Sequence, residues 1–113
     1  MDYAVPYPQD ADGDALRKVA AHGADMSRPM IIDFSVDASN EEVARSVASL
    51  VTSRGYDPKI YHDDESGNWS VYCSRSMLAT YEGVVAAQDE LNALLQSLGA
   101  VCDGWGTFGN KSG

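Results

Sequence analysis

The sequence predicts an α+β domain in which helices cover one face of an antiparallel sheet. Two observations support this prediction. Short segments whose apolar residues alternate, as in half-buried strands, are interleaved with longer segments whose apolar residues recur at helical spacing. A chain of 113 residues has room for one such domain, since single cores commonly occupy ~100 to 150 residues. We expect a flexible N-terminal arm over residues 1–10, the domain over residues 11–110 and a tail over residues 111–113.

Three segments combine apolar residues at helical spacing with a polar cap, and they cover about residues 12–22, 39–55 and 80–99. Asp12 or Asp14 would cap the first helix. The second begins with Ser39-Asn-Glu-Glu42, which matches a capping box in which the serine and the second glutamate each satisfy a free backbone amide. Thr80 would cap the third helix, which Gly99 would end.

Four segments have the pattern of strands, and they cover residues 30–36, 56–62, 69–74 and 100–103. A hairpin turning on Gly67 would join the second strand to the third, and Trp69 is expected to anchor the core. After the first helix the order is therefore βαββαβ. This order is typical of a ferredoxin-like sandwich, with a four-stranded antiparallel sheet of strand order 4-1-3-2 and two helices on one face.

The predicted strand order has a consequence for the two cysteines, Cys73 and Cys102. The third and fourth strands flank the first, so they lie two strand spacings apart, about 9 to 10 Å. A disulfide requires Cα atoms within roughly 7 Å. We therefore expect both thiols to be free.

The charge of the chain is strongly acidic, with 17 acidic residues against 8 basic ones and a net charge of -9. Such a surface repels nucleic-acid backbones and attracts basic protein surfaces, so direct nucleic-acid binding is not expected. Asp2 and Pro6 lie where a signal peptide would be charged and then apolar, and there is no apolar span. We expect a cytoplasmic protein without a membrane segment.

The sequence contains no catalytic constellation, and we expect neither an enzyme nor a bound metal or cofactor. Asp10-Ala-Asp-Gly-Asp14 begins like a calcium loop, but its glycine is misplaced and Ala21 stands at the last ligand position. His62-Asp-Asp-Glu65 offers four metal-binding side chains, yet strand neighbours point to opposite faces. A solvated hairpin explains this run better.

The sheet face without helices is the first place to look for a binding site. It would carry Asp33, Ser35, Ser70 and Tyr72, which is a poor platform for stacking RNA bases. Trp105 lies between two glycines, either as a core plug, which we favour, or as an exposed anchor for a protein partner with Asp103 beside it. The candidate partner-binding residues are Asp103, Trp105, Asp33 and Tyr72.

The C-terminal run Asp103-Gly-Trp-Gly-Thr107, followed by Phe108, resembles the C-terminal signature of the RraB family, protein inhibitors of ribonuclease E. Gly23-Ala-Asp25 and Gly55-Tyr56 are further matches, and the similarity extends from about Asp12 to Phe108. The resemblance implies a ferredoxin-like sandwich with an extra N-terminal helix. It also implies a regulator without catalytic residues that binds the C-terminal scaffold region of ribonuclease E and modulates RNA decay.

The resemblance leaves two matters open. The chain ends at Gly113, where the best-known members continue into a long acidic tail; if that tail contributes to binding, we expect weaker binding here. The alternative function is a small-ligand-binding or self-association module on the open sheet face, and we expect a monomer or a weak homodimer. A hydrolase or metal protein that uses His62 is a third hypothesis.

Overall fold

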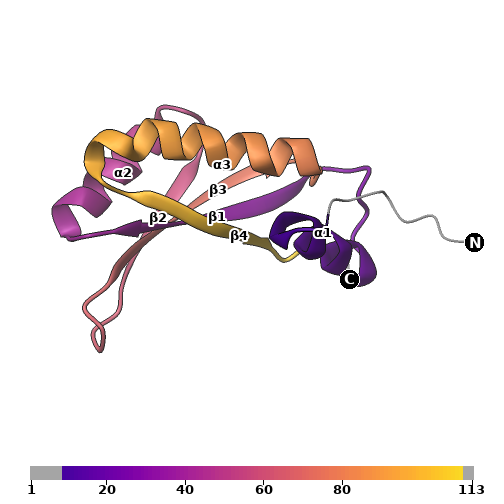
Figure 1. The fold of residues 1–113 in the computed structure, drawn as a ribbon, viewed down its shortest axis with the longest axis horizontal. Helices are drawn as coiled ribbons and strands as arrows, with labels where there is room; N and C mark the ends of the chain where they lie inside the picture. The colour runs from indigo at the N-terminus through magenta and orange to yellow at the C-terminus, as the bar shows by residue number, and fades with distance from the viewer. Residues whose placement is uncertain (1–8, 111–113) are drawn as a thin grey trace, which may run out of the picture.

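In the computed structural model, which describes residues 9–110, helices cover one face of a four-stranded antiparallel sheet (Figure 1). The elements in chain order are α1 (Ala11–Ala21), β1 (Met30–Ala38), α2 (Glu41–Thr52), β2 (Asp57–His62), β3 (Trp69–Met77), α3 (Tyr81–Leu95), the 3-10 turn η1 (Gln96–Leu98) and β4 (Val101–Thr107). The tail expected over residues 111–113, and most of the arm expected over residues 1–10, lie outside the described residues.

The strands lie in the order β2-β3-β1-β4, and every neighbouring pair is antiparallel. This is the predicted order 4-1-3-2 counted from the opposite edge. The sheet differs from the prediction in the lengths of its strands and in an irregularity between Ser35 and Val36, where the pairing of β1 with β4 shifts register. α1 lies at the end of the sheet where β4 leaves it (Figure 1).

The core is formed by the helix-covered side of β1 and its neighbours. Alternate residues of β1 are buried, namely Met30, Ile32, Phe34 and Val36. Val71 and Cys73 extend this layer on β3, and Cys102 extends it on β4. The layer is covered by the buried residues of α2 and α3, which are Ala44, Val47, Val51, Val84, Ala87, Leu91 and Leu95. The strand period of two therefore decides which residues of β1 are left on the open face.

Both cysteines lie in this buried layer on opposite sides of β1. Cys73 pairs with Phe34, and Cys102 pairs with Val36. Both thiols are free, as the strand order predicted. Burial raises the pKa of the Cys73 thiol to about 12, so this sulfur is a packed apolar group at neutral pH.

Two of the predicted helix caps are wrong by a few residues. α1 is capped by Asp10, whose carboxylate accepts a hydrogen bond from the Gly13 amide at 2.8 Å, and not by Asp12 or Asp14. α2 is capped by Asn40 and not by Ser39. Asn40 has an extended backbone, and its side-chain oxygen accepts a hydrogen bond from the Val43 amide at 2.8 Å.

The other helix boundaries agree better with the sequence. The Thr80 side chain accepts a hydrogen bond from the Gly83 amide at 3.0 Å and caps α3, as predicted. Gly99 ends η1 with a φ of 69°, a left-handed conformation that glycine adopts without steric cost.

Two strand predictions also need correction. β4 continues to Thr107 instead of ending at Asp103, so the Gly-Trp-Gly run belongs to a strand and not to a loop. It can do so because β1 continues to pair with β4 beyond the register shift, from Gly104 to Thr107. Trp69 packs against the core as expected but is only half-buried, and its ring stacks on His62 with centroids 4.2 Å apart, so it lies at the rim of the core and not in its interior.

The α2 cap can be tested with neighbouring substitutions. We expect Asn40→Ala to lower the free energy of unfolding by about 1 kcal/mol, because the Val43 amide loses its partner. Ser39→Ala should change it by less than about 0.5 kcal/mol. Urea unfolding followed by circular dichroism measures both values, and a larger loss for Ser39→Ala would restore the original capping-box assignment.

Candidate functional site

The open face of the sheet is organised in rows of residues that lie opposite one another across the strands. The register from β4 through β1 and β3 to β2 gives three such rows, which are Gly106-Asp33-Ser74-Asp57, Gly104-Ser35-Tyr72-Lys59 and Val101-Asp37-Ser70-Tyr61. Directly opposed residues have Cβ atoms roughly 4.5 to 5.5 Å apart. Each row therefore brings residues from distant parts of the sequence into contact range.

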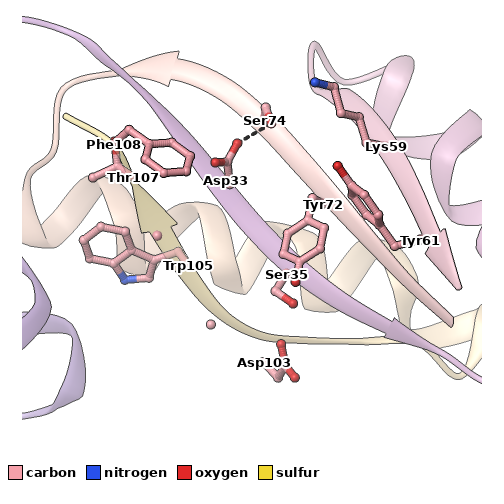
Figure 2. A pocket seen from close by; sticks show the side chains of 12 residues that line it. Asp33, Ser35, Lys59, Tyr61, Tyr72, Ser74, Asp103, Trp105, Thr107 and Phe108 are labelled. Atoms are coloured by element: carbon pink, nitrogen blue, oxygen red, sulfur yellow. Dashed lines mark hydrogen bonds between the residues drawn. The ribbon is translucent and has the colours of Figure 1, made fainter. Parts of the chain in front are cut away.

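A hollow of about 690 Å³ lies on this face. Its lining comes from all four strands and from the residue after β4, and consists of Asp33, Ser35, Lys59, Tyr61, Tyr72, Ser74 and residues 103–108. Figure 2 shows Phe108 and Trp105 on one side, the two tyrosines on the other, and Asp33 and Asp103 toward opposite ends. The hollow is thus an open groove with aromatic sides and acidic ends.

The aromatic residues of the hollow are substantially exposed. Phe108 is fully exposed, and Tyr61 and Tyr72 have exposed fractions of 53% and 39%. The two tyrosine rings meet edge to face, with centroids 5.2 Å apart and an interplanar angle of 78°. This contact fixes their orientation and leaves ring surface available to a partner.

The carboxylates of the open face have no cationic partner within the described chain. Asp33 accepts a hydrogen bond from the Ser74 hydroxyl, which orients its carboxylate (Figure 2). A hydrogen bond to Asp103, together with partial burial and repulsion from that carboxylate, raises the pKa of Asp37. Within residues 9–110, neither these three residues nor Lys59 forms an ion pair. The face therefore keeps unneutralised negative charge.

Trp105 has a different role from the open-face residues. It pairs with Phe34 on the helix-covered side of β4, is half-buried and packs against the core. Its indole N–H donates to the Asp12 carboxylate at 2.8 Å, and the same oxygen accepts a hydrogen bond from the Gln88 amide at 3.1 Å. Trp105 therefore ties α1 to the sheet and contributes only its remaining exposed edge to the hollow.

A second tether follows directly after β4. The Thr107 hydroxyl donates to the Ile31 carbonyl at 2.6 Å. The Asn110 side chain accepts a hydrogen bond from the Asp25 amide at 2.8 Å and donates to the carbonyls of Asp25, Arg28 and Pro29. These bonds hold the chain that carries Phe108 against the turn before β1.

The other sequence candidates are not brought into a reactive arrangement. His62 stacks on Trp69, and its Nδ1 lies 3.4 Å from Asp64, whose side chain is almost fully exposed. Across residues 9–110, no group of three or more His, Cys, Asp or Glu side chains is arranged to hold a metal ion.

The structure brings Asp33, Tyr72 and Asp103 together around one hollow, with Trp105 at its border. Sequence reasoning missed Lys59 and Tyr61, which β2 contributes, and did not include Phe108 among the site residues. The alternation within β2 could have identified the first two, because both lie on the face opposite Ile60. No pattern indicated that Phe108 would be fully exposed.

Comparison with known proteins identifies one family. The model of the RraB family, described as regulator of ribonuclease activity B, matches residues 9–107. The matched residues include all four strands of the sheet, β1, β2, β3 and β4. No curated protein matches the chain. In the described part of the chain, no helix has the length and apolar character needed to cross a membrane.

The tether through Trp105 can be tested by substitution. We expect Trp105→Phe to lower the free energy of unfolding by about 1 to 2 kcal/mol, because Asp12 loses the indole donor and packing is reduced. The control is Phe108→Ala in the same segment, which should change stability by less than about 0.5 kcal/mol because that ring is exposed. Chemical unfolding measures both, and equal losses would contradict the assigned roles.

The pair of Asp37 and Asp103 predicts a pH dependence. A folded-state pKa above the unfolded value means that the folded protein binds the proton more readily, so stability falls as pH rises through the folded pKa. We expect Asp103→Asn to raise the free energy of unfolding at pH 7 by roughly a few tenths of a kcal/mol, since exposed charges are screened. The gain should vanish below pH 3.8, the ordinary value for this carboxyl.

The control for this pH dependence is Asp89→Asn, which removes an exposed carboxylate of α3. Thermal unfolding from pH 3 to pH 7 follows both variants. A pH-independent gain for Asp103→Asn, or an equal gain for Asp89→Asn, would show that repulsion between the pair does not contribute.

Proposed function

The chain belongs to the RraB family, and from this premise we propose that it is a non-catalytic regulator that binds the C-terminal scaffold region of ribonuclease E and modulates RNA decay. The family is described as a regulator of ribonuclease activity, and its model covers residues 9–107. The order βαββαβ after α1 supports a ferredoxin-like sandwich for this regulator. The ribonuclease is proposed to bind on the open sheet face.

The observation that carries this choice of surface is the hollow on a sheet face that no helix covers. α2 and α3 both lie on the opposite face, so the tyrosines and Phe108 are exposed on the two sides of the same hollow. Exposed aromatic residues gathered in a concave patch are typical of protein interfaces, where they provide most of the binding energy. Asp33, Tyr72 and Asp103 are accordingly proposed as contact residues, with the exposed edge of Trp105 beside them.

The negative charge of the open face also supports binding of the ribonuclease there. With a net charge of -9 and open-face carboxylates that lack ion-pair partners within the described chain, this surface should attract a basic segment of the ribonuclease. Such steering accelerates association and weakens as salt screens the charges. We therefore expect the complex to form faster at low ionic strength.

A second candidate function uses the same hollow for a small ligand or for a second copy of the chain. The observation that favours it is the size of the hollow, about 690 Å³, which lies within the range of ligand pockets. Sedimentation of the isolated protein separates the self-association version from the first proposal. A stable dimer that Tyr72→Ala dissociates would favour self-association.

The proposed binding can be measured with the isolated C-terminal region of ribonuclease E. We expect Tyr72→Ala and Asp33→Asn each to weaken the affinity by about tenfold, because each removes a central contact. Asp89→Asn, which removes the same charge from α3, should leave the affinity within about twofold. Calorimetric titration at two salt concentrations measures these values.

The outcomes of this titration separate the possibilities. Absence of binding by the unsubstituted protein at micromolar concentration would refute the proposed function. Binding that all three variants retain would move the interface away from the open face. Circular dichroism of each variant confirms that it is folded before its affinity is compared.

A further inference from the structure

The hollow is open on the β4 side because β4 has glycine at the two positions nearest its centre. Gly104 and Gly106 are the β4 residues opposite Ser35 and Asp33. A Cβ atom at either glycine would meet no neighbouring atom within 4 Å, so each occupies a position where a side chain would extend into open space. The two glycines on either side of Trp105 therefore leave the floor of the hollow uncovered.

Gly106 is not required by the backbone of β4. Gly104 has a φ of 155°, which L-residues rarely adopt, whereas Gly106 is absent from the glycines with positive φ. A glycine inside a strand costs roughly 0.5 to 1 kcal/mol relative to alanine. Neither local conformation nor lack of space explains this cost at Gly106. The effect that remains is to keep the hollow open between Asp33 and Phe108.

The surroundings of this floor indicate the chemistry of its occupant. The Asp33 carboxylate, oriented by Ser74, lies between exposed aromatic rings on both sides of the hollow (Figure 2). Asp103 adds a second carboxylate at the other end, and Lys59 is the one cationic side chain in the lining. A group that is positively charged, planar and able to stack on aromatic rings satisfies all these features.

We propose that this hollow receives an arginine side chain of the protein partner, with its guanidinium paired to Asp33 and stacked on Tyr72 or Phe108. The identity of the partner rests on the proposed function, whereas the preference for arginine rests on the hollow itself. Arginine is favoured over lysine because its planar guanidinium stacks on rings and donates two parallel hydrogen bonds to a carboxylate. A nucleic acid is disfavoured because the same carboxylates repel phosphates.

The inference is tested by filling the hollow without changing its charge. Gly106→Val places a branched side chain in the open space above the floor, and a β-branched residue suits a strand. The control is Ser76→Val, which adds an equally large side chain at an exposed β3 position outside the hollow, opposite Ile31. Both variants should unfold at or slightly above the temperature of the unsubstituted protein.

The probes are two fluorescent peptides of Gly and Ser that carry either four arginines or four lysines. We expect the unsubstituted protein and Ser76→Val to bind the arginine peptide about tenfold more tightly than the lysine peptide. Gly106→Val and Asp33→Asn should lose this preference. Equal binding of the two peptides by the unsubstituted protein, or an unchanged preference in folded Gly106→Val, would overturn the inference.

The same variants, titrated with the C-terminal region of ribonuclease E, distinguish the two proposals. If that region binds Gly106→Val as tightly as the unsubstituted protein, the arginine inference fails and the proposed function stands. If that region does not bind at all, but the protein still binds the arginine peptide more tightly than the lysine peptide, the proposed function fails and the preference of the hollow for arginine stands.

Discussion

The alternation of buried and open-face residues along β1 is the constraint on which the rest of the structure depends. β1 lies between β3 and β4, and its four buried residues face the helix-covered side of the sheet. Because the strand period is two, this requirement also places Asp33, Ser35 and Asp37 on the opposite face. The acidity of the candidate surface is thus set by the same strand that forms the centre of the core.

The two faces of β4 have different roles. Toward the helices, Trp105 packs on the core and ties α1 to the sheet through Asp12. Toward solvent, the glycines on either side of that tryptophan leave the hollow open. The run from Asp103 to Thr107, which resembles the signature of the family, therefore combines a structural residue with the positions that shape the proposed binding surface.

Much of this arrangement could be predicted from the sequence because it follows from strong periodic patterns. The burial pattern of β1 follows from the alternation of its apolar and polar residues. The strand order follows from the sequence of elements, and the free cysteines follow from the strand order. The caps of α1 and α2 could not be located as well, because Asp, Asn and Ser compete for neighbouring cap positions with similar energies. In the structure, Asp10 and Asn40 occupy these positions.

Two features of the site that were missed, the extension of β4 and the contact between Tyr61 and Tyr72, depend on pairing across the sheet. β4 was expected to end at Asp103 because glycines weaken strands, yet pairing with β1 carries it to Thr107. Tyr61 lies beside Tyr72 of the neighbouring strand, and the two rings meet edge to face. Local sequence patterns carry no information on which exposed rings of separate strands will meet.

The central claim is that the open sheet face, and not the helical face, binds the ribonuclease. NMR chemical-shift mapping of the isotopically labelled protein with the unlabelled C-terminal region of ribonuclease E tests it most directly. The structure predicts the largest shift changes in the side-chain signals of Tyr61, Tyr72 and Phe108 and in the amide signal of Gly106, with small changes in α2 and α3. Changes concentrated in α2 and α3, with the open-face signals unmoved, would contradict the claim.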